Sequence, residues 1–127
     1  MRINTLHTEQ TYRRGDLWLA DLTGVTGSEQ GGIRPAIILS NDIGNRFSPI
    51  VTIAIVSSQM GKKRLPTHVF LDAERYNLER DSIVLTEQLK TIDKWNLMRK
   101  LTSLDRHAMD EIEKALIVSL DIQLCAV

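Results

Sequence analysis

The residues best suited to chemistry lie in one glycine-rich stretch, Gly27–Pro35, which reads GSEQGGIRP. Arg34 precedes Pro35, and a residue before proline is pushed toward extended backbone, so we expect Arg34 to project from the start of a strand. A guanidinium donates two parallel hydrogen bonds to a phosphate or a carboxylate, while the glycines let backbone N–H groups approach an anion. Composition leaves two interpretations open: an anion-binding loop, or a surface loop whose arginine makes a structural salt bridge.

Other kinds of catalytic site find less support in the sequence. The histidines His7, His68 and His107 are far apart, and no metal-ligand spacing is present, so we expect neither a metal nor a cofactor. The glycine-rich stretch lacks the lysine and Ser/Thr of a P-loop. Because no Gly-x-Ser-x-Gly motif marks a nucleophile, the serine hydroxyls are expected to act as hydrogen-bond donors.

Two basic clusters and the aromatic side chains are compatible with nucleic acid. Arg13-Arg14 and Lys62-Lys63-Arg64 could steer a phosphate backbone, or they could be solvated surface charge. The aromatic residues could stack on bases or serve only as packing: Tyr12, Trp18, Phe47, Phe70, Tyr76 and Trp95.

The composition predicts one small domain without a strongly charged surface. The 127 residues carry 16 basic and 16 acidic side chains, and the pI near 6.8 argues against a general binder of polyanions. Cys125 is the single cysteine, which excludes an intrachain disulfide and favours the reducing cytoplasm. The polar start of the chain and its short apolar runs predict neither export nor membrane insertion. We expect residues 1–13 to be a polar tail and residues 14–127 to be the domain.

The pattern of apolar residues predicts the short strands that must position these groups. Five strands are expected, at residues 16–22, 34–40, 50–57, 67–71 and 82–89. The first is expected to have one packed face, and the second to be covered on both faces. Residues 41–45 are expected to form a turn, and residues 93–97 a short helical turn. This spacing is typical of a small, strongly bent sheet or barrel.

The C-terminal part of the sequence predicts an amphipathic helix. Its apolar residues recur at helical spacing, with charged residues between them: Met109, Ile112, Leu116 and Leu120. Asp105 is the expected N-cap, and Leu104 and Met109 are spaced to form a hydrophobic staple across it.

An ordered series of segments resembles the MazF/PemK-like toxin family, especially its members from Gram-positive bacteria. The segments are RGD at 14–16, GSEQGGIRP at 27–35, NDIGNRFSP at 41–49, LPTHV at 65–69, ERDS at 79–82, EQ at 87–88 and TID at 91–93. The match extends from residue 14 to about residue 120. The resemblance implies a mainly β fold with α, an SH3-like small barrel of short, mostly antiparallel strands with a C-terminal amphipathic helix.

The resemblance also implies a function, that of a sequence-specific endoribonuclease (mRNA interferase), the toxin of a type II toxin–antitoxin system. Members are homodimers that cut single-stranded RNA without a metal and are silenced by a cognate antitoxin. Arg34 matches the family's catalytic arginine, and Ser57 stands where many relatives carry a catalytic threonine. Ser57 keeps the hydroxyl and lacks the methyl group, so we expect the chemistry to survive. Polar positions of the family's RNA groove are matched by Ser28, Glu29, Gln30, Asn41, Ser82, Glu87 and Gln88.

We expect the ribose 2′-OH to attack the adjacent phosphorus, which leaves a 2′,3′-cyclic phosphate and a 5′-OH. Arg34 and Ser57 would donate hydrogen bonds to the charge that builds on the phosphoryl oxygens. Arginine is almost never neutral in a protein, so Glu29 is the candidate base, and the acid stays unassigned. An acidic antitoxin tail laid along the same groove would inhibit by competition.

Two alternatives belong to other functional classes. Toxins that share the barrel fold but poison DNA gyrase act without enzymatic chemistry, and such a toxin carries a tryptophan near its C-terminus. This chain has no tryptophan after Trp95 and retains Arg34 and Ser57. The second alternative is an inactive module that binds RNA and does not cut it.

Overall fold

The strands of the protein form one six-stranded antiparallel sheet, in a computed structural model that describes residues 10–25, 31–59 and 64–125. In chain order the elements are β1 (Asp16–Asp21), β2 (Ile33–Ile38), α2 (Asp42–Phe47), β3 (Ile50–Ser57), β4 (His68–Leu71), α3 (Ala73–Tyr76), β5 (Ser82–Asp93), the 3-10 helix η1 (Lys94–Asn96), β6 (Leu97–Ser103) and α4 (Arg106–Ser119). The sheet order is β4-β5-β3-β2-β1-β6, so β4 and β6 are its edges.

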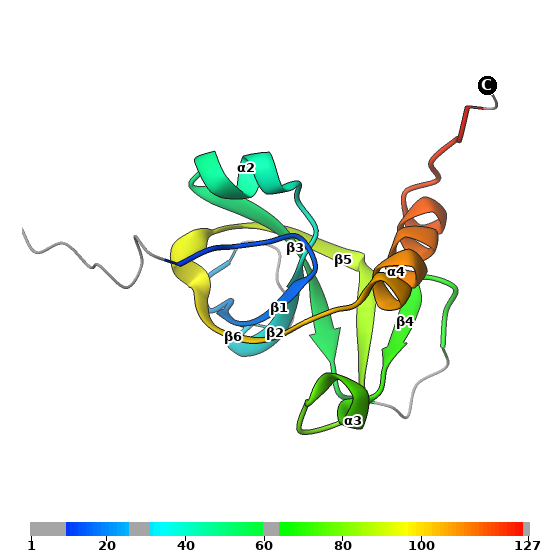
Figure 1. The fold of residues 1–127 in the computed structure, drawn as a ribbon, viewed down its shortest axis with the longest axis horizontal. Helices are drawn as coiled ribbons and strands as arrows, with labels where there is room; N and C mark the ends of the chain where they lie inside the picture. Colours follow the sequence, from blue (N-terminus) through cyan, green and yellow to red (C-terminus); the bar gives the residue numbers. More distant parts are fainter. Residues whose placement is uncertain (1–9, 26–30, 60–63, 126–127) are drawn as a thin grey trace, which may run out of the picture.

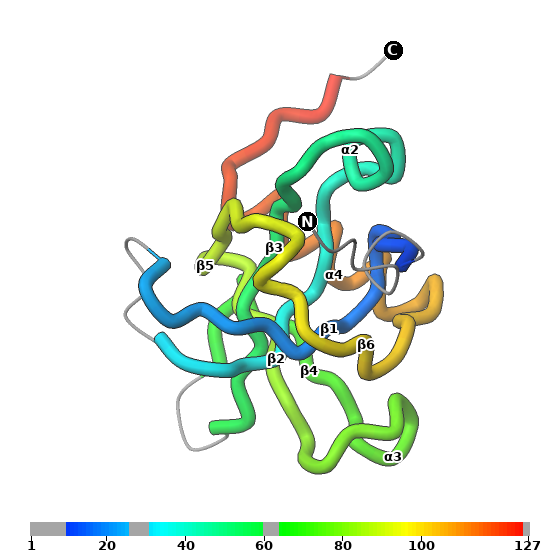
Figure 2. Tube along the Cα trace, turned by 90° about the vertical axis from the view of Figure 1, so that its left-hand side faces the viewer, coloured from blue at the N-terminus to red at the C-terminus, as the bar shows by residue number. Residues whose placement is uncertain are grey.

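The sheet is strongly curled, and β3 pairs with β2 where its two halves meet (Figure 1). In one half, β1, β2 and β6 curve round an apolar interior, and in the other half β3, β5 and β4 lie side by side. Figure 2 shows the same arrangement from the side, with α2 and α3 at opposite ends of the molecule. The predicted fold, a small bent antiparallel sheet followed by a C-terminal helix, is confirmed.

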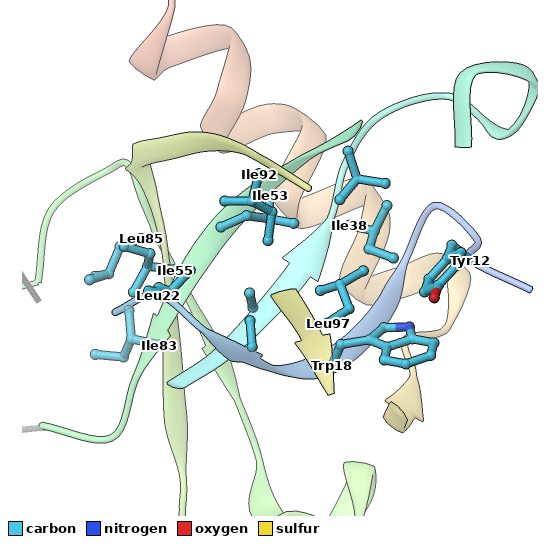
Figure 3. Close-up of a cluster of buried hydrophobic side chains, with 13 residues drawn as sticks. Tyr12, Trp18, Leu22, Ile38, Ile53, Ile55, Ile83, Leu85, Ile92 and Leu97 are labelled. Carbon is cyan, nitrogen blue, oxygen red and sulfur yellow. The ribbon is translucent and has the colours of Figure 1, made fainter. Parts of the chain in front are cut away.

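Two apolar clusters lie on the two faces of this sheet. The inner cluster fills the curl and includes Trp18, Ile38, Ile53, Ile55 and Leu97 (Figure 3). The outer cluster joins alternate residues of the same strands to the buried face of α4: Leu17, Ile37, Val56, Val84, Ala108, Met109, Ile112 and Ala115. Successive strand residues point to opposite faces, which is why the same strands contribute to both clusters.

The predicted C-terminal helix is confirmed as α4. Asp105 is its N-cap, and its carboxylate accepts the backbone N–H of Ala108 at 2.9 Å. Leu104 packs against the cluster that contains Met109, as a hydrophobic staple requires. The helical turn expected at residues 93–97 is also present, as η1.

Three local predictions were wrong or incomplete. The first strand was expected to have one packed face, but Leu17 and Trp18 are both buried, because β1 separates the inner cluster from the outer one. The turn expected at residues 41–45 is the start of helix α2, for which Asn41 is the N-cap. Strand β6 and helix α3 were not predicted.

The N-terminal residues nearest the domain pack against the sheet. Tyr12 lies in the inner cluster, with its ring centroid 5.0 Å from that of Trp18, and Arg13 donates its backbone N–H to Asp16 at 3.3 Å. Among the described residues, no helix has the length and apolar character needed to cross a membrane.

Candidate active site

Arg34 and Ser57 lie near the adjoining ends of the neighbouring strands β2 and β3. The antiparallel ladder between these strands includes the pair Ala36 and Ile55. Arg34 and Ser57 each lie two residues beyond that pair, toward the same end of the sheet. Both residues have the parity of Ala36 and Ile55, which lie in the inner cluster. The two side chains therefore lie on the inner face, where the apolar interior ends.

The local backbone fixes the start of β2 and with it Arg34. Gly32 has a φ of +95°, a left-handed conformation that favours glycine, and its carbonyl accepts the N–H of Leu22 at 2.8 Å. This bond closes the neck of the β1–β2 connection. Arg34 follows two residues later, half-buried and paired with Ala20 of β1.

Ser57 ends β3 with its hydroxyl oriented by the chain that follows. The residue is 8% exposed, and its Oγ accepts the backbone N–H of Gln59 at 3.2 Å. A hydroxyl has one proton to donate and can accept further bonds. Because this contact uses only an acceptor position, the Ser57 proton stays available for an anionic oxygen beside Arg34.

Glu87 and Gln88 lie in an irregular part of β5 that faces β3. Ala54 pairs with Leu89 while the next residue, Ile55, pairs with Leu85, so β5 carries extra residues there, as in a β-bulge. The bulge removes Glu87 and Gln88 from the regular ladder. Bulges of this kind often direct side chains toward functional sites.

Two neighbours hold the carboxylate of Glu87. His68 Nε2 lies 3.0 Å from Oε2 of Glu87, and the Thr67 hydroxyl donates to Oε1 at 3.1 Å. The backbone N–H of Leu65 points at Nδ1 of His68, 3.2 Å away. Since Nδ1 accepts this bond, the neutral ring carries its proton on Nε2 and donates it to Glu87.

The other predicted site residues lie elsewhere. Asn41 caps α2 by accepting the N–H of Gly44 at 2.8 Å, and the adjacent Ser40 bonds to Thr52, five residues or roughly 16 Å along β3 from Ser57. Ser82 has the opposite parity from Ile83, which pairs with Ser57, so Ser82 faces the other side of the sheet. Its hydroxyl donates to the carbonyl of Arg80 at 3.0 Å. The residues Ser28, Glu29 and Gln30 lie outside the described part of the chain.

The basic clusters separate into structural and surface groups. Arg14 is part of the fold, because its Nε donates to the carbonyl of Leu39 at 3.0 Å and its Nη1 meets Glu113 at 2.9 Å. Arg64 instead lies over the ring of Phe70, 5.2 Å from its centroid. Lys62 and Lys63 are not among the described residues. Within residues 10–25, 31–59 and 64–125, no three His, Cys, Asp or Glu side chains gather as metal ligands would.

Phe70 was expected only as one of six aromatic residues that could stack on bases, and His68 was not expected to be a site residue. Phe70 pairs with Ile83 and His68 pairs with Leu85, so both lie on the face that carries Ser57. Figure 3 shows Ile83, Leu85 and Ile55 together at one end of the inner cluster. The strand predicted at residues 67–71 alternates about Val69, and that alternation was the signal that His68 and Phe70 share a face.

Together, these observations describe a small curled antiparallel β-sheet protein with a C-terminal helix, in which Arg34 and Ser57 lie near the ends of two neighbouring strands. The chain belongs to the PemK-like, MazF-like toxins of type II toxin–antitoxin systems, and the family model matches residues 13–120. The resemblance inferred from its motifs is thereby confirmed.

Individual relatives agree with this assignment. Endoribonuclease EndoA of Bacillus subtilis is 54% identical over 108 residues, which are 85% of this chain and 93% of that protein. Among solved structures, MazF from Deinococcus radiodurans superposes with a TM-score of 0.75 at 25% identity, covering 90% of this chain and all of the other. A mycobacterial endoribonuclease in complex with its cognate antitoxin has a TM-score of 0.75 at 23% identity, over 91% of this chain and all of that chain; this last likeness concerns the fold.

Proposed function

We propose that this toxin is an endoribonuclease that cuts single-stranded RNA at short recognition sequences, near the adjoining ends of β2 and β3 that carry Arg34 and Ser57. The observation that supports the proposal is that Arg34 and Ser57 each lie two residues beyond the Ala36–Ile55 pair on neighbouring strands, where one phosphate would meet two donors of different kinds. The family and the 54% identity to an endoribonuclease support the same activity.

The proposed reaction needs no metal, because RNA carries its own nucleophile. The ribose 2′-oxygen loses its proton to a base and forms a bond to the adjacent phosphorus, while the bond from phosphorus to the 5′-oxygen breaks. The 5′-oxygen takes up a proton. The products are a 2′,3′-cyclic phosphate and a 5′-OH, and DNA, which lacks the 2′-OH, is not cut.

Arg34 and Ser57 lower the barrier by holding charge on the phosphoryl oxygens. In the transition state these oxygens carry more negative charge than in the substrate, so fixed donors bind the transition state more strongly. A donor of this kind is worth about 3 kcal/mol of barrier when it is already oriented. The bond from Gln59 to Ser57 supplies such orientation. Glu29 is proposed as the general base.

We propose that polar side chains around this pair read the RNA. Glu87 and Gln88, in the irregular part of β5, are two of these proposed residues. The remaining residues of the proposed RNA groove are Ser28, Gln30, Asn41 and Ser82. Hydrogen bonds to the edges of unstacked bases provide the sequence preference.

We also propose that the toxin acts in the cytoplasm as a homodimer. In support, Ile43, Phe47 and Trp95 are strongly exposed and line one cleft of about 790 Å³ beside α2, and exposed apolar patches mark interfaces. Ile43→Asp should convert a dimer to a monomer in sedimentation equilibrium. Val118→Asp, at an exposed apolar position on α4, should stay dimeric, and a wild-type monomer would end this part of the proposal.

A cognate antitoxin is the proposed protein partner. A related mycobacterial endoribonuclease has been solved in complex with its cognate antitoxin, and an acidic segment lying along the RNA groove would exclude the substrate. Titrating the antitoxin against a non-cleavable 2′-deoxy RNA tests this, because the two should compete. Simultaneous binding of both would contradict a shared groove.

The decisive experiment compares Arg34→Ala with Arg99→Ala on a long mixed-sequence RNA in the presence of EDTA. Arg34→Ala should cut at least roughly 100-fold more slowly, while Arg99→Ala, which removes an exposed arginine from β6, should cut normally. Fragment ends should be 2′,3′-cyclic phosphate and 5′-OH. RNA bound but left intact by the wild type would favour a binding module, and no effect on RNA would favour gyrase as the target.

A further inference from the structure

Phe70 is an exposed aromatic residue of β4, and the residues before and after it in the sequence are buried. It is 40% exposed, whereas Val69 and Leu71 belong to the outer cluster beneath α4. Strand alternation therefore puts the ring on the face of β4 opposite the helix. Burying an aromatic ring is favourable, so a ligand that covered this partly exposed ring would gain binding free energy.

The ring belongs to the same cross-strand row as Ser57. Phe70 pairs with Ile83, and Ile83 pairs with Ser57, so the three side chains share one face. Strands lie about 4.8 Å apart, which puts Phe70 roughly 10 Å from Ser57 along this row. Arg34 lies on β2, the strand that follows β3 in the sheet order.

The surroundings of the ring are polar and partly cationic. The guanidinium carbon of Arg64 is 5.2 Å from the ring centroid, as in a cation–π contact. On the same face of β4, the residue two before Phe70 is His68, which bonds to Glu87. A single ring among hydrogen-bonding groups and a cation suits a nucleobase, which has an apolar face, polar edges and an attached phosphate.

We propose that Phe70 is a stacking platform for one base of the RNA strand near the scissile phosphate, and that Arg64 holds the phosphate of that nucleotide. This inference rests on the proposed function and adds a specificity-determining residue to it. Stacking on a side chain tolerates any base, so Phe70 strengthens binding at one position while polar groups beside it set the preference.

Substitutions at Phe70 separate a stacking role from a structural one. Phe70→Tyr keeps the aromatic face, Phe70→Leu keeps apolar bulk without it, and Phe70→Ala removes both. The alanine and leucine variants should raise KM about 5- to 100-fold on a short cleavable RNA, with kcat nearly unchanged, and the tyrosine variant should match the wild type. Met98→Ala, an exposed apolar residue on the other edge strand, is the matched control and should leave KM unchanged.

A series of oligonucleotides identifies the base that stacks. The cleaved sequence is first found from a mixed RNA pool, and an abasic nucleotide is then placed at each position in turn. At one position the abasic substrate should raise the wild-type KM and should abolish the difference between wild type and Phe70→Ala.

The outcomes keep the two proposals apart. If the wild type cuts no RNA, the proposed function fails. If the wild type cuts RNA while Phe70→Ala has a normal KM, or if Phe70→Leu equals Phe70→Tyr, the stacking platform is overturned and the proposed function stands.

Discussion

His68 fixes the carboxylate of Glu87 through a bond whose direction the backbone dictates. The N–H of Leu65 occupies Nδ1 of the ring at 3.2 Å, so Nε2 carries the proton that lies between the ring and Glu87 Oε2 at 3.0 Å. The ring is almost enclosed, with a side chain that is 10% exposed, against 35% for Glu87. Both carboxylate oxygens of Glu87 are thus held, one by His68 and one by Thr67, and the side chain stays partly exposed to solvent.

A substitution of His68 that keeps a donor near Nε2 should impair cleavage less than one that removes it. His68→Gln can place an amide donor near the position of Nε2, whereas His68→Asn is too short to reach Glu87. Hydrogen bonds to charged groups contribute about 1.5–3 kcal/mol, so His68→Asn should lower kcat/KM roughly tenfold or more, and His68→Gln should lose less. In a Glu87→Gln background the asparagine substitution should have little further effect. Fully additive losses would show that His68 acts on something other than Glu87.

Ser57 should tolerate a methyl group and not the loss of its hydroxyl. Ser57→Ala removes one of the two proposed donors, so kcat should fall by roughly 100- to 1000-fold. Ser57→Thr restores the residue found in many relatives and stiffens χ1, so activity should stay within about tenfold of wild type. Single-turnover cleavage measures both variants. An alanine variant with normal turnover would remove Ser57 from the mechanism.

The elements that were best predicted from the sequence are those whose buried residues form a continuous or periodic apolar pattern. Strand β3 is an unbroken apolar run buried along most of its length, and α4 buries residues at helical spacing. Strand β6 was missed because Met98, Arg99 and Lys100 in its middle are exposed, so no apolar alternation marks it. An edge strand is held by its partner β1, and that pairing leaves no periodic signal in the chain.

The site was predicted only as far as the resemblance reached. Periodicity identified the strands that carry Arg34 and Ser57, but the pairing of β2 with β3 depends on contacts between the two strands and not on local sequence. The bulge in β5 and the bond from His68 to Glu87 were beyond prediction for the same reason. They depend on pairing between residues distant in sequence, for which local propensity carries no information.

Asp105 should stabilise the protein in a pH-dependent way. The backbone N–H of Ala108, followed by the guanidinium of Arg75, lowers the pKa of Asp105 to about 2. A carboxyl with a lowered pKa contributes stability that is full above its unfolded pKa of about 4 and is lost as pH falls toward the folded value. Asp105→Asn, which keeps a capping oxygen, should lower Tm by roughly 2–4 °C near neutral pH.

The difference between wild type and Asp105→Asn should narrow between about pH 4 and pH 2, as followed by urea unfolding midpoints. Asp110→Asn is the matched control, because Asp110 pairs with the exposed Arg106 on the same helix, and it should shift the midpoint little at any pH. A difference that stayed constant down to pH 2 would mean that the charge of Asp105 is not what stabilises the cap.

Gly15 joins the start of β1 to the neighbouring segments in a conformation that favours glycine. Its φ is +93°, its N–H donates to Ile38 at 2.8 Å, and its carbonyl accepts the N–H of Leu104 at 2.9 Å. A Cβ added here would lie 3.3 Å from Sδ of Met109, closer than side chains normally pack. Gly15→Ala therefore combines backbone strain of about 1–2 kcal/mol with displacement of a buried side chain of α4.

Comparison with Gly24→Ala separates the backbone strain from the cost of displacing Met109. Gly24 also has a positive φ, +79°, but a Cβ there would meet nothing within 4 Å, so its substitution carries the backbone strain alone. Urea unfolding should show Gly15→Ala as the less stable variant, and the gap between the two measures how far Met109 must move. Because methionine is flexible and adapts to irregular gaps, that gap should be about 1 kcal/mol or less. Equal losses in the two variants would show that Met109 moves aside without cost, which would leave the φ angle as the whole reason for glycine at residue 15.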